Sequence, residues 1–216
     1  RRNDRTRAAR YLKRAVALKA AINKHGWDGE WYVGATRDDG RPLGSKTQKE
    51  GKIFLNTQTW AIINDTATGA RAKQCMASAE KHLFREYGPL LHTPAYTVTD
   101  STIGYLSRYA PGVRENGGLY THAGTWAIQA VAMTGDGDKA YKVYRSFLPI
   151  LRGLNPDLYY AEPYVTPGNV DGPESPHFGR GGWTWYTGSA AWLFRVTLDY
   201  ILGIHAMADG LQINPC

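Results

Sequence analysis

The segment Trp27-Asp28-Gly29-Glu30-Trp31 places two carboxylates between two indoles. Indole faces can stack on the apolar face of a pyranose ring, and an apolar wall raises the pKa of a neighbouring carboxyl, as a general acid requires. The same residues also suit a turn in which Asp28 caps the backbone and both tryptophans pack in the core, because Asp is common in such turns. The sequence leaves both interpretations open.

Two further segments lead into predicted helices. Residues 114–122, RENGGLYTH, end at a helix start near His122, and residues 179–189, GRGGWTWYTGS, end at another. A helix N-terminus offers unpaired N–H groups and the positive end of the helix dipole, which suit an anion such as phosphate. His122 could donate to that anion or only cap its helix. The run Thr187-Gly188-Ser189 could cradle it, or its Thr or Ser could only supply an N-cap after core tryptophans.

Helical patterns dominate the chain, and long loops separate them. The apolar spacing predicts helices over residues 5–24, 57–67, 70–86, 122–134, 138–151 and 188–203. Short Gly-containing turns at 68–69 and 135–137 predict two antiparallel αα-hairpins. The fold class is therefore predicted to be all-α, with no evident repeat of fixed period. The loops between the hairpins hold the three segments above, and long ordered loops usually carry function.

Both ends of the sequence are abrupt. The first residues already lie within an amphipathic helical pattern, with no evident N-cap before the arginines. Residues 210–214 alternate apolar and polar side chains as a strand does, and no partner strand is evident. We therefore expect a segment of a larger protein, with apolar helix faces exposed and this strand unpaired.

Composition narrows the classes of partner. The 216 residues are 43% hydrophobic and 12% aromatic, enough for a sizeable core. The formal charge of +7 suggests nucleic acid or an anionic membrane, but residues 1–14 carry most of it and the rest is nearly neutral. There is no nucleic-acid-binding motif and no apolar run long enough to span a membrane. We expect neither partner, and a cytoplasmic location.

Cysteine and histidine spacing argues against a metal site. Cys75 and Cys216 form no disulfide framework and no Cys-x-x-Cys pair, and the six histidines lack the close spacing of metal ligands. We therefore expect no metal and a reducing compartment. Cys75 lies in a helical pattern and is expected to be a small core residue.

Glycoside hydrolase family 94 is the family that the chain resembles. These cellobiose- and chitobiose-type phosphorylases were formerly grouped as glycosyltransferase family 36. The resemblance runs collinearly from about Ala8 to Cys216 through WDGEWYV, EGKIFLNTQTWAII, PGVRENGGLYTHAGTWAI, EPYV and GRGGWTWYTGSAAWLFRV. It implies that residues 1–208 are part of an (α/α)6 toroid barrel, the catalytic domain, and that residues 209–216 begin a C-terminal β-domain.

The resemblance also implies the reaction, which is inverting phosphorolysis of a β-linked disaccharide or oligosaccharide. Phosphate attacks the anomeric carbon and an α-sugar 1-phosphate forms, with Asp28 as the general acid. No cofactor is implied, because phosphate is a co-substrate. An inverting hydrolase would need a second carboxylate to activate water, whereas phosphate already carries its charge.

The remaining site residues come from the same matching. His122, Thr187 and Gly188 would hold phosphate, and the sugar would be bound by Trp27, Arg114 and Glu115. The chain departs from the family pattern at Gly168, where many members have a sugar-binding Gln, and at Gly34, where an Arg is common.

The resemblance does not select one substrate or exclude two alternative functions. Cellobiose, a cellodextrin, cellobionic acid, laminaribiose, chitobiose and β-1,2-glucan are all candidate substrates, and a homodimer is the oligomer considered for the full-length enzyme. Two alternatives to phosphorolysis are an inverting hydrolase on the same barrel and a non-catalytic sugar-binding fragment. Dependence on phosphate separates the three.

Overall fold

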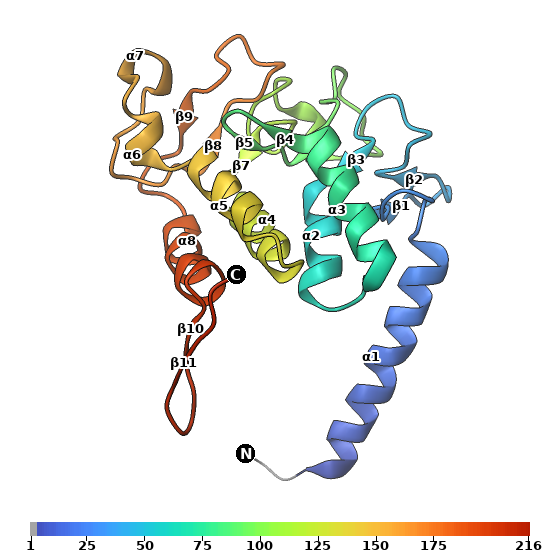
Figure 1. Ribbon diagram of the computed structural model, residues 1–216. Helices are drawn as coiled ribbons and strands as arrows, with labels where there is room; N and C mark the ends of the chain where they lie inside the picture. The colour runs from blue at the N-terminus through green and yellow to red at the C-terminus, as the bar shows by residue number, and fades with distance from the viewer. Residues whose placement is uncertain (1–3) are drawn as a thin grey trace.

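The computed structural model describes residues 4–216, and its fold is mainly helical (Figure 1). The α-helices are α1 (Arg5–His25), α2 (Leu55–Ile63), α3 (Gly69–Leu83), α4 (Thr121–Met133), α5 (Gly137–Ser146), α6 (Pro149–Arg152), α7 (Pro156–Tyr159) and α8 (Ser189–Val196). A 3₁₀ turn, η1 (Tyr105–Arg108), and a π-helical turn, η2 (Thr197–Ile201), complete the helical elements. All six predicted helices are present.

The boundaries differ from the predictions for local reasons. The helix predicted over 138–151 is interrupted after Ser146 and resumes as α6 at Pro149, whose ring has no N–H to continue the hydrogen-bond ladder. The last predicted helix changes to π-helical geometry at Thr197, where α8 ends.

The loops contain short strands, and the all-α prediction did not include these strands. They are β1 (Ala35–Thr36), β2 (Pro42–Leu43), β3 (Ile53–Phe54), β4 (Phe84–Arg85), β5 (Gly88–Pro89), β6 (His92–Thr93), β7 (Leu119–Tyr120), β8 (Asn169–Val170), β9 (Gly181–Gly182), β10 (Ile204–Ala206) and β11 (Leu211–Ile213). The antiparallel order β7-β8-β9 ties the loop before α4 to the loop before α8, which lies about 50 residues later in the sequence.

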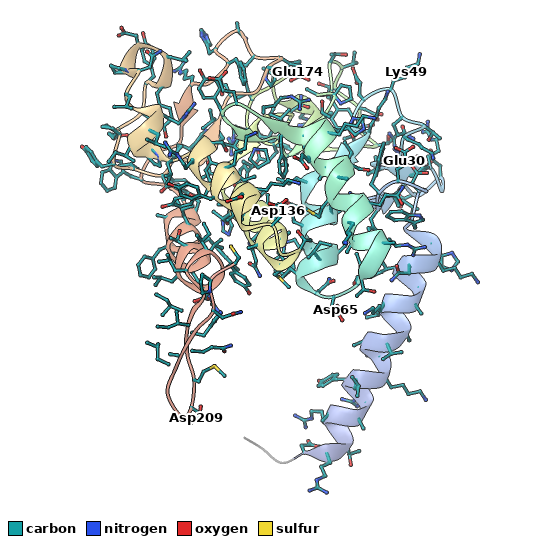
Figure 2. All side chains as sticks on the ribbon, viewed as in Figure 1. Glu30, Lys49, Asp65, Asp136, Glu174 and Asp209 are labelled. Atoms are coloured by element: carbon teal, nitrogen blue, oxygen red, sulfur yellow. The ribbon has the colours of Figure 1, made fainter. Side chains whose placement is uncertain are left out.

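The helices form a row with a second layer behind it. Helix α4 packs against α2 on one side and α8 on the other, while α3 packs on α2 and α5 on α4. The two predicted αα-hairpins, α2–α3 and α4–α5, are therefore confirmed. Helices α2, α4 and α8 all begin at the end of the molecule that carries the long loops (Figure 1). Lys49 and Glu174 lie at this end and Asp65 at the opposite one (Figure 2).

The core lies between the two helix layers. Leu55, Leu83, Ile128 and Phe147 are fully buried there, together with Cys75. Burial raises the pKa of the Cys75 thiol to about 12, so this sulfur is a protonated packing atom at neutral pH. The prediction of a small core residue is confirmed.

Two predictions about the ends are wrong. Helix α1 has an N-cap, because the Asp4 side chain accepts a hydrogen bond from the backbone N–H of Arg7 at 2.9 Å. Strand β11 has a partner, because the chain reverses between Met207 and Gly210 and β10 pairs with β11 from Ile204 opposite Ile213. Gly203, which has a φ of +64°, lies just before this hairpin. A side chain at 203 would collide with the Asn214 carbonyl, which makes glycine necessary there.

The prediction of exposed apolar helix faces is confirmed. No residue of α1 is buried, and Leu12 and Val16 are 68% and 62% exposed. The helix touches the body mainly through its C-terminal half, where Lys19 pairs with Asp65 and Asn23 donates to the Thr66 carbonyl. No helix among residues 4–216 has the length and apolar character needed to cross a membrane.

We predict that residues 1–216 self-associate when produced alone, because α1 exposes contiguous apolar surface to water. Light scattering should show a mass above that of the monomer that increases with concentration. A Leu12→Lys, Val16→Glu double variant, which removes apolar surface and keeps the net charge, should shift the equilibrium towards monomer. A monodisperse wild-type monomer at high concentration would contradict the prediction.

Candidate active site

The first turns of α4 and α8 meet at the loop end of the molecule. His122 is the second residue of α4, and Gly188 is the N-cap residue of α8. A Cβ atom on Gly188 would lie 3.8 Å from Cε1 of the His122 ring, so the imidazole lies directly beside this helix start. The structure thus brings together the two segments that the sequence placed at helix starts.

The His122 ring lies in an aromatic setting. Its centroid is 5.0 Å from that of Trp126 and 5.8 Å from that of Trp192. Burial lowers the pKa of His122, so the imidazole is neutral at neutral pH, with one nitrogen as donor and the other as acceptor. A neutral imidazole at a helix start is suited to donate a hydrogen bond to an anion.

Thr187 closes a short turn just before α8. Its Oγ1 accepts from the backbone N–H of Ser189 at 3.1 Å and lies 3.0 Å from the Ser189 hydroxyl. The N-cap residue of α8 is Gly188, which makes no side-chain cap hydrogen bond, so the Thr or Ser N-cap raised by the sequence is not formed. The N–H groups of the first helical turn point to this end. Within residues 4–216, no three His, Cys, Asp or Glu side chains gather closely enough to hold a metal ion.

Three tryptophans lie in a row about one turn after these helix starts. This row was not predicted from the sequence. Trp60 of α2, Trp126 of α4 and Trp192 of α8 are equally spaced along the chain, and Thr-Trp-Ala-Ile occurs at both 59–62 and 125–128. The centroids of neighbouring rings are 5.2 and 5.9 Å apart. The earlier conclusion that no fixed-period repeat exists is thus wrong for the row α2, α4 and α8. The equal spacing of the tryptophans was the available signal.

Arg114 and Glu115 occupy the corner of a tight turn. The buried Asn116 side chain closes this turn, because it accepts from the Tyr96 N–H and donates to the carbonyls of Tyr96 and Tyr109 at 2.7 to 2.9 Å. Arg114 has a φ of +53°, an uncommon backbone state for a residue with a side chain. The anchored turn therefore fixes where both charged side chains leave the backbone.

The Arg114 guanidinium is held between two aromatic rings. It lies 4.1 Å from the centroid of Trp183 and 4.8 Å from that of Tyr109. Its Nε is 3.5 Å from Glu115 Oε2, which is buried and has no hydrogen-bond partner among the described residues. A buried carboxylate oxygen without a donor is costly, so this atom is ready to accept from a ligand hydroxyl.

Gly168 connects the Arg114 turn with the start of α4. Its carbonyl accepts from the Thr121 N–H at 3.1 Å, and a Cβ at 168 would come within 2.9 Å of the Trp183 Cβ. A glutamine at this position, common in the resembled family, has no room unless Trp183 moves. Arg114, Glu115, His122, Thr187 and Gly188 thus belong to one cluster of loops held by the sheet β7-β8-β9.

Asp28 lies in a different loop, which its carboxylate braces by accepting hydrogen bonds from neighbouring residues. Its Oδ2 accepts from Ser45 Oγ at 2.9 Å and from the Lys46 N–H at 2.7 Å. The carbonyls of the next two residues, Gly29 and Glu30, accept from side chains of α3. Glu30 lies on the α3 side of the molecule, with α2 and α4 between it and α8 (Figure 2). These contacts favour the turn interpretation of Asp28.

Trp27 and Trp31 also pack within this loop. Trp27 lies edge-on to Tyr32 at 5.0 Å, and the Arg71 guanidinium lies 4.8 Å from its ring centroid. Trp31 is buried and donates to the Gly44 carbonyl at 2.8 Å. The Trp27 ring is therefore engaged by protein groups, and the structure gives no support to its stacking on a sugar.

The sequence of the chain matches a known family. The family model described as the glycosyl hydrolase 94 superfamily, catalytic domain, matches residues 1–203. The chain therefore belongs to the catalytic domain of glycosyl hydrolase family 94.

Three relatives illustrate its range. The chain is 40% identical over 213 residues to a solabiose phosphorylase of Paenibacillus borealis, covering 99% of this chain and 28% of that protein. It is 32% identical over 208 residues to an N,N'-diacetylchitobiose phosphorylase of Vibrio proteolyticus, covering 95% and 26%. It is 38% identical over 224 residues to the cyclic beta-(1,2)-glucan synthase NdvB of Rhizobium meliloti (strain 1021), covering 99% and 8%. The chain thus spans about a quarter of each of these phosphorylases.

We predict that Asn116→Ala destabilises the fold by about 2 to 4 kcal/mol, because it removes three hydrogen bonds and leaves buried backbone groups of Tyr96 and Tyr109 unpaired. Urea denaturation measures this loss. Asn155→Ala, which changes an exposed residue whose side chain makes no cap hydrogen bond, is the matched control and should stay within about 0.5 kcal/mol of wild type. Equal stability of the two variants would show that the amide does not hold the turn.

Proposed function

We propose that this chain is the phosphate- and acceptor-binding part of an enzyme that cleaves a β-linked disaccharide or oligosaccharide with inorganic phosphate. The observation that carries the proposal is the contact between His122 and Gly188, which joins two helix starts into one anion-binding corner. The names of the phosphorylase relatives support the same reaction class.

Phosphate would bind where α4 and α8 begin. N–H groups of the first turn of α8 and the His122 imidazole supply donors, and both helix dipoles present their positive ends. A bound phosphate oxygen then attacks the anomeric carbon while the bond to the glycosidic oxygen breaks. The departing oxygen takes a proton from an acid, and the sugar leaves as its α-1-phosphate. Phosphate held in line with this bond supplies the effective concentration that the step requires.

The departing sugar would bind at the Arg114 turn. Glu115 Oε2 can accept a hydroxyl hydrogen bond that no group among the described residues provides. Charge-assisted bonds of this kind are stronger than neutral ones and discriminate between hydroxyl patterns. Stacking between Trp183 and Tyr109 keeps Arg114 in place beside Glu115.

The arrangement of the helices supports a further part of the proposal. A row of α2, α4 and α8 with α3 and α5 behind it is what part of the inner and outer rings of an (α/α)6 barrel requires. Residues 1–208 would then be barrel, and the β10–β11 hairpin would lead into a C-terminal β-domain at residues 209–216. In this arrangement the starts of the inner helices face the site.

Phosphate dependence tests the reaction. The full-length protein, incubated with a panel of β-linked disaccharides, should form sugar 1-phosphate only when phosphate is present. We predict that His122→Ala raises the KM for phosphate about tenfold or more, while His122→Gln, which keeps an N–H donor, loses less. Sugar release that is independent of phosphate would indicate a hydrolase, and sugar binding without turnover would indicate a non-catalytic domain.

The general-acid role of Asp28 is a separate proposal that competes with the bracing role. If Asp28 is the acid, Asp28→Asn should reduce phosphorolysis of an unactivated disaccharide by about 10² to 10⁴ and spare an aryl glycoside whose leaving group needs no proton. The two hydrogen bonds that Asp28 Oδ2 accepts lead us to expect the bracing pattern instead.

If Asp28 only braces its loop, Asp28→Asn should reduce activity on both substrates by the same factor and lower the melting temperature of the protein. Ser45→Ala, which removes one donor to Asp28 and no carboxylate, is the matched control. It should reproduce part of the Asp28→Asn effect if Asp28 is a brace. Selective loss on the unactivated substrate, with Ser45→Ala like wild type, would establish the acid role.

A further inference from the structure

A cavity of about 610 Å³ runs along α2 from Asn56 to Asn64, against the C-terminal end of α1. The groups lining it include Gly34, Asn56, Thr57, Trp60 and Ile22 of α1. Its volume is in the range of small-molecule sites, and it combines an aromatic ring and an apolar wall with an amide and a hydroxyl. This composition is what a sugar ring, with apolar faces and a polar rim, requires.

One end of the cavity, at Asn56, is in register with the His122 corner. Asn56 is the second residue of α2, as His122 is of α4, and each precedes by one helical turn the tryptophan of its own helix. The rings of Trp60 and Trp126 are in contact, with centroids 5.2 Å apart. Asn56 therefore stands on α2 where His122 stands on the neighbouring helix, at the same end of the molecule.

The Asn56 side chain is not held by any hydrogen bond among the described residues. Its Oδ1 is buried without a hydrogen-bond partner, and among residues 4–216 no hydrogen bond uses its amide. Leaving such a group unpaired costs about 1 to 3 kcal/mol. By contrast, Gln58 of the same helix has both its amide atoms bonded to the backbone of Tyr32.

We infer that Asn56 and Thr57 bind hydroxyl groups of the sugar substrate, with Trp60 as the apolar wall of this subsite. Gly34 leaves the space open, since even a Cβ there would already lie 3.6 Å from the Thr57 hydroxyl. A pyranose hydroxyl donates and accepts at once, so it can pair with either atom of the amide. This inference rests on the proposed phosphorolysis and adds a second sugar-binding element, on α2, to the Arg114 turn.

The test uses the full-length enzyme and a disaccharide that the wild type phosphorolyses. Asn56→Ala should lower kcat/KM for that disaccharide about 10- to 100-fold and leave the KM for phosphate within about twofold. Monodeoxy analogues of the disaccharide then locate the contact. The hydroxyl bound by Asn56 is the one whose deletion harms the wild type and has little further effect on Asn56→Ala. Asn155→Ala is the matched control and should behave as wild type.

Each outcome bears on one claim. A wild-type enzyme that makes no sugar 1-phosphate from any disaccharide overturns the proposed function, and sugar titration monitored by Trp fluorescence then shows whether Asn56→Ala still weakens binding. Active wild type with unchanged kcat/KM in Asn56→Ala overturns the inference alone. A raised KM for phosphate in Asn56→Ala overturns the sugar assignment. Asn56→Ser keeps a small polar group, so a misfolded Ala variant leaves the subsite testable.

Discussion

The close packing of α4 is the constraint on which the rest of the structure depends. This helix is buried on almost every side, and small residues such as Ala123, Gly124, Ala127 and Ala130 let α2, α5 and α8 approach it. A Cβ on Gly124 would lie only 3.2 Å from the Phe147 ring, so even one methyl group would push α5 outwards. Because α4 fixes the positions of α2 and α8, it also fixes the distance between the polar groups at their starts.

Two kinds of structure form the site: closely packed helix starts, and loops with a strained backbone. Arg114, Trp183 and Trp185 all have positive φ values, a state that costs energy for side chains of this size. Trp183 stacks on Arg114, and Trp185 donates to Glu162 at 2.9 Å. The loops tolerate the strain because β7-β8-β9 and the Asn116 amide fix their ends, and the result is a charged turn in a single orientation.

Helix positions were predictable from the sequence because each helix carries its own apolar period. The N-cap at Asp4 was missed among the surrounding arginines. The pairing of β10 with β11 depends on a turn over residues 207–210 that apolar periodicity does not register. The proximity of His122 and Gly188 depends on how α4 and α8 pack, which no local pattern encodes. For Asp28 the sequence offered two roles, and the hydrogen bonds from Ser45 and Lys46, which no local pattern predicts, favour the turn.

The charges at the His122 corner show what an anion needs from the rest of the protein. Burial keeps His122 neutral, and Arg114 is engaged by Trp183 and lies beside Glu115. Two helix starts contribute roughly half an elementary charge each, whereas phosphate near neutral pH carries about −1.5 to −2. A phosphate bound as proposed would therefore keep about 0.5 to 1 unbalanced negative charge at this corner. If phosphate binds here as proposed, its balancing positive charge has to come from a group beyond the His122 corner.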